Sequence, residues 1–215
     1  HARFVGMPLR KAIAQLDRPA LRPIARRELG LDAERPVLLV SGGSQGAKSI
    51  NDATLAARAD LLAGGIEILH VLGPKNITDA DVPVTDPDTG ARYLPVGYVD
   101  AMERAYAAAD LMVGRSGAGT VMETAVAGLP CVFVPLPHGN GEQARNAAFL
   151  IEAGAGRLVA NAELSASRMV GEVLPLLKAP GQLAAMRTKL AGLVPSDAAG
   201  DLARAVIEAA AGGIR

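Results

Sequence analysis

The stretch Val113-Gly-Arg-Ser-Gly-Ala-Gly-Thr-Val-Met-Glu-Thr-Ala-Val-Ala-Gly-Leu-Pro130 has the pattern of a strand end, a glycine-rich turn and a helix. The apolar run 111–113 is typical of a buried parallel strand. Ser116, Gly117 and Gly119 favour a tight turn after it. The helix that follows has one apolar face and is closed by Gly128. This order of elements predicts an α/β fold.

The same stretch predicts a site for an anion. A strand, turn and helix in this order leave unpaired N–H groups and the positive end of the helix dipole at one edge of the sheet, where a phosphate or diphosphate binds. Glu123 lies one turn further along, within reach of a sugar attached to that phosphate. Thr120 and Glu123 also have the spacing of a capping box, in which Glu123 would bind the N–H of Thr120. Spacing alone leaves both interpretations open.

The composition bounds the class of protein. The 215 residues are 50% hydrophobic, which suffices for one α/β domain with room for a small appendage. Acidic and basic residues number 22 each and there is no Trp, so nothing indicates nucleic-acid binding. The single Cys131 excludes an internal disulfide and fits a reducing compartment. No apolar run reaches the ~18 residues of a membrane span. The start at His1 looks like a cut within a longer chain.

Strand and helix patterns alternate along the chain at short spacing. Six strands are expected, at 36–43, 66–73, 93–98, 111–113, 131–136 and 156–160, with helices between and after them. They predict a doubly wound, six-stranded parallel sheet of the Rossmann-like kind. Residues 1–34 are expected to form a connector and first segment, and residues 35–215 the domain itself. The stretch 74–90, rich in Asp, Pro and Thr, is expected to be a loop.

Three loops of glycine and small polar residues leave the carboxyl ends of strands, at 41–46, 115–119 and 137–141. Ligands of open α/β sheets bind at that edge. The first loop lacks the full dinucleotide-binding spacing, and the second strand ends without an acidic residue for a ribose. The loops therefore favour a phosphate-containing ligand other than a dinucleotide.

The first loop also fits another class of protein. Gly42-Gly-Ser-Gln-Gly46 matches the nucleophile elbow of α/β hydrolases, with Ser44 as nucleophile. The base would be His70 or His138, whereas the histidine of such a triad usually lies late in the chain. An α/β hydrolase is thus an alternative.

The remaining candidates each have an ordinary interpretation beside a functional one. Asn140 and Gln143 either direct their amides at sugar hydroxyls or cap a helix. His138 is a ligand contact or a surface histidine. Arg10 and Arg115 either pair with a diphosphate or are solvated surface groups.

Taken in order, the motifs resemble the C-terminal, nucleotide-sugar-binding domain of MurG-type glycosyltransferases over nearly the whole chain. They are Val5-Gly-Met-Pro-Leu-Arg10, Gly42-Gly-Ser-Gln-Gly-Ala47 with Asn51, His70-x-x-Gly-Pro-Lys-Asn76, Tyr98-Val-Asp-x-Met102 with Tyr106, Arg115-Ser-Gly-Ala-x-Thr-Val-x-Glu123, Ala127-Gly-Leu-Pro130 and Gly139-Asn-Gly-Glu-Gln-x-x-Asn-Ala147. The form around His70 looks actinobacterial. Met7 replaces the usual Asn of the first motif, and Glu142 stands where many members have Gln.

This resemblance implies a donor-binding half of a metal-independent, inverting GT-B enzyme without a cofactor. Such enzymes transfer N-acetylglucosamine from UDP to lipid I, giving lipid II for peptidoglycan and hence for cell-wall growth, cell shape and division. Glu123 would bind ribose, the backbone at Val99 would read uracil beside Met102, and Asn140 and Gln143 would bind the sugar. The other substrate-binding residues that it implies are Arg10, Ser44, Gln45, Arg115, Ser116, Gly117, Gly119, Thr120 and His138.

The resemblance also implies a missing part. The family's N-terminal domain carries the acceptor site, the expected catalytic base and the membrane-facing patch, and nothing in this sequence matches it. We therefore expect no catalytic residue here and no transfer by this chain alone. The full-length enzyme would be a peripheral protein at the cytoplasmic face of the membrane, with lipid I as its partner and no nucleic acid. Another GT-B UDP-sugar transferase acting on a glycolipid is the alternative within the class.

Overall fold

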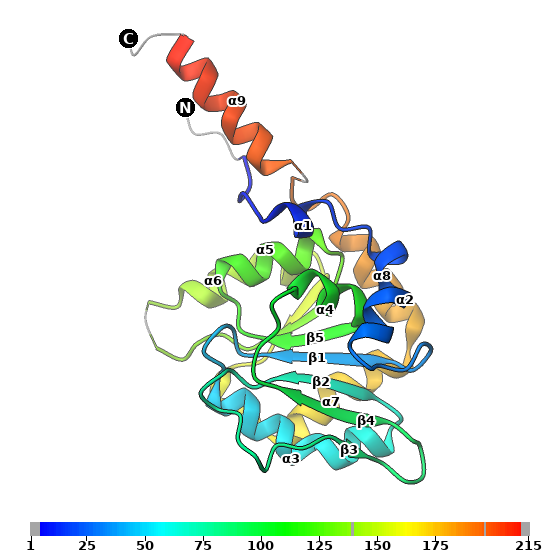
Figure 1. Cartoon of the computed structure of the whole chain (residues 1–215). Helices are drawn as coiled ribbons and strands as arrows, with labels where there is room; N and C mark the ends of the chain where they lie inside the picture. The colour runs from blue at the N-terminus through cyan, green and yellow to red at the C-terminus, as the bar shows by residue number, and fades with distance from the viewer. Residues whose placement is uncertain (1–4, 139, 196, 212–215) are drawn as a thin grey trace.

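The computed structural model describes residues 5–138, 140–195 and 197–211, and they form a mostly parallel sheet between helices (Figure 1). The strand order is β3-β4-β2-β1-β5-β6-β7. All neighbouring strands are parallel except β3 and β4. The strands are β1 (Val37–Ser41), β2 (Glu67–Val71), β3 (Val84–Thr85), β4 (Arg92–Val96), β5 (Leu111–Gly114), β6 (Cys131–Phe133) and β7 (Gly156–Leu158). The doubly wound parallel fold is confirmed.

The expected count of six strands is wrong, because the structure adds β3. This strand has only two residues and pairs antiparallel with β4, Val84 lying opposite Tyr93. Asp86 builds the turn between the two strands, since its N–H donates to the carbonyl of Ala91 at 2.9 Å and its side chain accepts from Thr89. A strand of two residues is too short to show an alternation of apolar and polar side chains. The composition of residues 74–90 therefore indicated only a loop.

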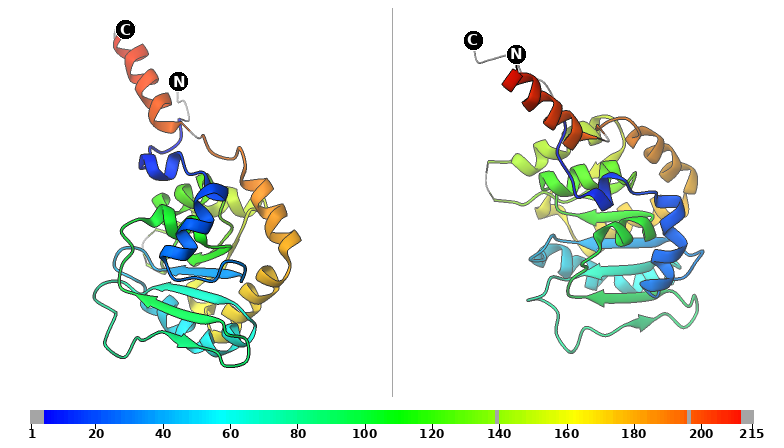
Figure 2. Two further views of the ribbon diagram at one scale, coloured as in Figure 1. Left: turned by 45° about the vertical axis from the view of Figure 1, so that its right-hand side comes forward. Right: turned by 45° about the horizontal axis from the view of Figure 1, so that its top comes forward.

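Helices cover both faces of the sheet, as the two views of Figure 2 show. Val37 and Leu39 of β1 belong to one buried cluster, whereas Leu38 and Val40 belong to the other, because successive side chains of a strand point to opposite faces. The helices are α1 (Lys11–Ala14), α2 (Arg18–Glu28), α3 (Lys48–Ala63), α4 (Met102–Ala108), α5 (Ala118–Val126), α6 (Glu142–Glu152), η1 (Asn161–Glu163), α7 (Ala166–Lys178), α8 (Pro180–Leu190) and α9 (Ala198–Ala211). Strands buried on both faces explain the continuous apolar runs of the sequence.

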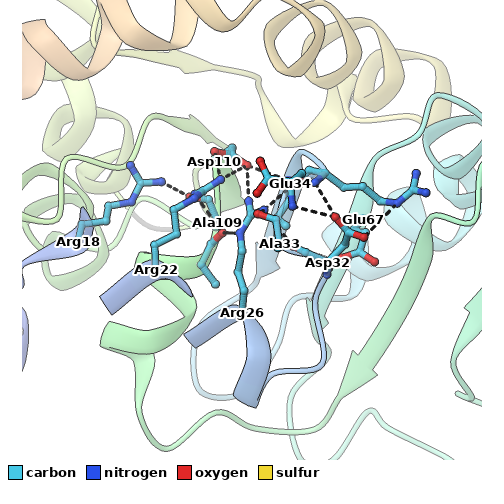
Figure 3. A network of polar contacts seen from close by, with 12 residues as sticks. Arg18, Arg22, Arg26, Asp32, Ala33, Glu34, Glu67, Ala109 and Asp110 are labelled. Atoms are coloured by element: carbon cyan, nitrogen blue, oxygen red, sulfur yellow. Dashed lines mark hydrogen bonds and ion pairs between the residues drawn. The ribbon is translucent and has the colours of Figure 1, made fainter. Parts of the chain in front are cut away.

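Helix α2 is fastened to the end of α4 by arginine side chains (Figure 3). Arg26 is 1% exposed, and its Nε donates to the carbonyl of Ala108 at 3.0 Å. Arg22 and Arg26 both pair with the Asp110 carboxylate at 2.8 Å. The carbonyls at the end of a helix lack partners within it, so these guanidinium groups satisfy them. The first segment of the chain thereby becomes part of the domain core.

Helix α9 lies apart from the sheet. Figure 1 shows it projecting from the body of the domain, on the same side as the first described residues. Its side chains Leu202, Val206 and Ile207 are exposed. The loops that follow the parallel strands gather at a different place, the carboxyl edge of the sheet.

Candidate functional site

A cavity of about 160 Å³ opens at the carboxyl edge of the sheet, between the loops after β1 and β4 and the helices α4 and α5. It joins a mostly apolar wall to a few polar groups, as small-molecule sites do. Its lining residues are Ser41, Gly43, Ser44, Val71, Tyr98, Val99, Met102, Tyr106, Met112, Thr120 and Glu123. The structure thus brings five of the residues implied by the sequence, Ser44, Val99, Met102, Thr120 and Glu123, to one cavity.

Glu123 lies in this cavity with a specific partner on the neighbouring helix. The hydroxyl of Tyr106 donates a hydrogen bond of 2.7 Å to Oε2 of Glu123. Burial, and next the Glu123 carboxylate, raise the pKa of Tyr106 far above its ordinary value, so the hydroxyl stays protonated and remains a donor. Among the described residues the carboxylate has no other hydrogen-bond partner, so Oε1 is available to a ligand.

The capping-box interpretation of Glu123 is wrong. Helix α5 begins at Ala118 with Gly117 as its N-cap, so Thr120 is already inside the helix. Among the described residues no side chain caps α5. The first N–H of this helix that donates to a backbone carbonyl is that of Val121, whose acceptor is the carbonyl of Gly117. The N–H groups of the first turn are therefore available to an anion.

The start of α5 is open to a close approach by a ligand. A Cβ atom added at Gly117 or Gly119 would meet no atom within 4 Å. Ser116, just before the helix, is fully buried, and its Oγ has no hydrogen-bond partner in the described structure. Its carbonyl accepts from Asn146 of α6 at 3.1 Å, which fixes the turn. This geometry suits a phosphate group over the helix end.

The loop between β1 and α3 is held rigidly beside the cavity. Asn76 donates to the carbonyl of Gln45 at 2.8 Å and to that of Leu72 at 2.9 Å. Gly46 has φ 75°, and a Cβ there would lie 2.0 Å from the Leu72 carbonyl oxygen, so only glycine fits. The side chains of Ser44 and Gln45 remain exposed at the rim.

His70 is a buried part of the framework. Its ring is 0% exposed; Nε2 lies 3.2 Å from Oδ1 of Asn51, and Nδ1 lies 3.0 Å from the hydroxyl of Tyr93. Nδ2 of Asn51 donates to the carbonyl of Leu72, so Oδ1 faces the histidine, Nε2 carries the proton and Nδ1 accepts from Tyr93. Burial lowers the pKa of His70 to about 4. With both ring nitrogens engaged, His70 is not a base for Ser44.

Arg115 serves as an anchor between loops. Its guanidinium donates to the carbonyls of Val134 and Pro135, to Oδ1 of Asn161 at 2.8 Å and to Oγ of Ser49 at 3.0 Å. Most of its five donors are therefore bound within the protein, which leaves little for the diphosphate that the sequence suggested. Arg10, by contrast, is exposed where α1 begins. Its positive charge lies close enough to Tyr106 to lower the pKa of that tyrosine slightly, against the larger rise caused by burial.

The loop before α6 lies outside the cavity. His138 and Asn140 are exposed, and Gly139 of the sequence motif lies outside the described residues. Oδ1 of Asn140 accepts from the N–H of Glu142 at 3.2 Å, and Oε1 of Gln143 accepts from the N–H of Leu136 at 3.0 Å. Each amide keeps its NH₂ group, which donates, for a ligand. Asn140 thus shapes the entry to α6, although Gly141 is the N-cap.

The sequence motifs assign no role to several of the residues that line the cavity. They are Ser41, Gly43, Val71, Tyr98, Tyr106 and Met112. A signal existed for Tyr106, because it follows Met102 by four residues on the same helix and hence lies on the same face. In the sequence Val71 and Met112 are recognisable only as residues of apolar strands. The apolar runs do not show which strands border a cavity.

Among residues 5–138, 140–195 and 197–211, no three His, Cys, Asp or Glu side chains gather as a metal ion requires. Within these ranges no helix combines the length and the apolar character needed to span a bilayer.

Comparisons with known proteins agree on one family. Residues 37–202 match the glycosyltransferase family 28 C-terminal domain. A relative from Cutibacterium acnes, named UDP-N-acetylglucosamine–N-acetylmuramyl-(pentapeptide) pyrophosphoryl-undecaprenol N-acetylglucosamine transferase, is 58% identical over 97% of this chain and 57% of its own length. A Nocardioides relative of the same name is 50% identical over 97% of this chain and 56% of its own length.

A solved structure extends the comparison to the fold. The crystal structure of Acinetobacter baumannii MurG aligns with a TM-score of 0.71 and 28% identity, covering 88% of this chain and 55% of that one. The chain thus spans about half the length of the curated relatives it matches. By the match over most of its residues, the chain belongs to glycosyltransferase family 28, as a C-terminal domain of that family.

Proposed function

We propose that this chain is the donor-binding half of an enzyme that transfers N-acetylglucosamine from UDP-N-acetylglucosamine to lipid I, undecaprenyl-pyrophosphoryl-MurNAc-pentapeptide, to give lipid II. The observation that carries the proposal is the Glu123 carboxylate, which lines a cavity next to the uncapped start of α5. The names of the relatives supply the donor and the acceptor. The substrate is thus a nucleotide sugar, whose ribose matches the Glu123 carboxylate and whose diphosphate matches the start of α5.

The donor fits the site in a definite order. The uracil enters the apolar part of the cavity beside Val99 and Met102, and the ribose hydroxyls reach Glu123. The diphosphate lies over the first turn of α5, near the exposed Ser44. The sugar then faces the loop before α6, where Asn140 and Gln143 keep their NH₂ groups unbound within the described structure.

The chemistry of the transfer assigns this half a limited task. The acceptor hydroxyl attacks the anomeric carbon while the bond from that carbon to the diphosphate oxygen breaks, and UDP leaves with the bonding electrons. The N–H groups and dipole at the start of α5 stabilise the negative charge that develops on the departing diphosphate. A base must take the proton from the acceptor hydroxyl.

We infer that the base and the lipid site belong to the part of the relatives' length that this chain does not match. Of the candidate bases near the donor loops, Glu123 is bound to Tyr106 and His138 lies exposed on a loop outside the cavity. The chain alone therefore binds donor and transfers no sugar. In the full-length enzyme the lipid acceptor places the reaction at the membrane surface, on the cytoplasmic side where nucleotide sugars are found, and no nucleic acid takes part.

Calorimetric titration of the chain with UDP, UDP-N-acetylglucosamine and TDP tests the proposal. We expect UDP and UDP-N-acetylglucosamine to bind and TDP to bind more weakly. Similar binding of UDP-glucose and UDP-N-acetylglucosamine would favour another UDP-sugar transferase of the same fold. Absence of binding by all these nucleotides would contradict the proposal.

The α/β hydrolase is the remaining alternative, and the environment of Ser44 argues against it. His70 is engaged on both ring nitrogens, and no hydrogen bond joins Ser44 to a histidine among the described residues. A fluorophosphonate probe should therefore leave Ser44 unlabelled. Labelling that Ser44→Ala abolishes would support the hydrolase instead.

A further inference from the structure

We propose that Tyr106 is a positioning residue, which orients the Glu123 carboxylate toward the ribose and so sets the preference for ribonucleotides over deoxyribonucleotides. The inference rests on the proposed function, because it assumes a nucleotide in the cavity. Two observations carry it, the hydrogen bond between the two side chains and the way in which Tyr106 itself is held.

The hydrogen bond joins two helices across the cavity. Tyr106 lies on α4 and Glu123 on α5, and both line the cavity. The 2.7 Å distance from the hydroxyl to Oε2 is that of a strong hydrogen bond to a charged acceptor. A glutamate side chain has several rotatable bonds, so a fixed donor on one oxygen removes much of its freedom before a ligand arrives.

Tyr106 is held at both ends. Its side chain is 2% exposed, and its backbone carbonyl accepts from Nε of Arg18 at 3.1 Å. The same guanidinium donates to the carbonyl of Ala109, and Figure 3 shows Arg18 reaching from α2 toward this helix end. Helix α2 therefore fixes the end of α4, and the ring has little room to move. A donor placed in this way defines one direction for the carboxylate.

The orientation matters because of the chemistry of ribose. Its neighbouring 2′ and 3′ hydroxyls can both donate to one carboxylate if the carboxylate plane faces them. Each carboxylate oxygen has two lone pairs, so Oε2 can accept from Tyr106 and from the ribose at the same time. A 2′-deoxyribose offers one donor fewer and leaves part of the aligned carboxylate without a partner. The discrimination between the two sugars thus depends on the alignment that Tyr106 imposes.

The test is calorimetric titration of four variants and the original chain with UDP and 2′-deoxy-UDP. The variants are Tyr106→Phe, Glu123→Gln, the double variant of these two, and Tyr93→Phe as a matched control. Tyr93 is also fully buried and its hydroxyl also bears a hydrogen bond, to His70, but it does not line the cavity. The ratio of the two dissociation constants is the readout, since a general loss of packing weakens both nucleotides alike.

We expect the original chain to prefer UDP, and Tyr106→Phe to reduce that preference by about fivefold, the effect of one net hydrogen bond. Tyr93→Phe should keep the original ratio. In the Glu123→Gln background, Tyr106→Phe should change the ratio no further, because Tyr106 acts through the carboxylate. If Tyr106→Phe keeps the original ratio while UDP still binds, the positioning role is wrong and the proposed function stands. If the original chain binds neither nucleotide, the proposed function fails as well.

A variant that does not fold would not end the test. Arg18→Lys keeps the charge and a long flexible side chain but loses the donor geometry at the Tyr106 carbonyl, and it leaves the Tyr106 hydroxyl in place. We expect it to reduce the preference for UDP in the same direction and by a smaller factor. An unchanged ratio in a folded Arg18→Lys chain would contradict the claim that the end of α4 sets the carboxylate.

Discussion

Oδ1 of Asn51 lies 3.2 Å from Nε2 of His70, and this contact joins α3 to β2 one residue before Val71, which lines the cavity. Asn51 also binds the Leu72 carbonyl, next to the loop that carries Ser44. The pair is therefore part of the scaffold that fixes the cavity rim. A histidine used in this way must stay neutral, since Nδ1 accepts a hydrogen bond from Tyr93.

We predict that His70 makes the fold sensitive to acid. Burial lowers its pKa from 6.5 to about 4, so the unfolded chain takes up a proton that the folded chain does not. The stabilisation is complete above about pH 6.5 and is lost as the pH falls toward 4, by about 3 kcal/mol in all. Urea unfolding of the chain and of His70→Gln at pH 7, 6 and 5 measures it. The variant should lose less stability over this range than the original chain; parallel losses would contradict the prediction.

A second prediction concerns the arginines that surround Asp110. Burial alone would raise the pKa of Asp110, yet hydrogen bonds and charges from Arg22 and Arg26 and the N–H of Val37 lower it. Asp110→Asn keeps the shape and leaves these guanidinium groups facing one another, which should cost about 3 kcal/mol of unfolding free energy. Asp52→Asn is the control, since Asp52 is exposed and pairs with Lys48 on the surface. Equal, small effects in both variants would show that the network contributes little.

Glu123→Ala should weaken UDP binding more than it weakens the fold. The loss of charge-assisted hydrogen bonds to ribose should cost about 1.5–3 kcal/mol of binding free energy. The fold loses one hydrogen bond, from Tyr106, worth about 1 kcal/mol. Titration with UDP and a thermal melt separate the two effects. A variant that melts earlier but binds UDP normally would place the ribose elsewhere.

Gln143 should separate sugar recognition from nucleotide recognition. Gln143→Ala should reduce the preference for UDP-N-acetylglucosamine over other UDP-sugars and leave UDP affinity nearly unchanged. The structure adds a sharper comparison, because Oε1 of Gln143 also accepts from Leu136. Gln143→Glu keeps an acceptor for Leu136 and lacks the NH₂ donor, so both variants should lose the preference if that donor binds the sugar. If only the alanine variant loses it, Gln143 acts by holding the loop.

The sequence predicted the six parallel strands and the carboxyl-edge loops because buried parallel strands and glycine turns leave strong local patterns. It did not predict β3, whose two residues have no periodicity, nor the role of Arg115, whose partners Val134, Pro135, Asn161 and Ser49 come from distant segments. Glu123 shows the same limit, since its spacing from Thr120 suits a cap although the helix begins at Ala118. Which side chains share a cavity depends on tertiary contacts, and spacing along the chain does not show them.

The most direct test of the account is a crystal structure of this chain soaked with UDP. We predict that the uracil lies beside Val99, that both ribose hydroxyls lie within hydrogen-bond distance of the Glu123 carboxylate, and that the diphosphate contacts the N–H groups of the first turn of α5. Tyr106 should keep its hydrogen bond to Oε2 of Glu123 in the complex. UDP bound at another place, or in this cavity with its ribose away from Glu123, would contradict the account.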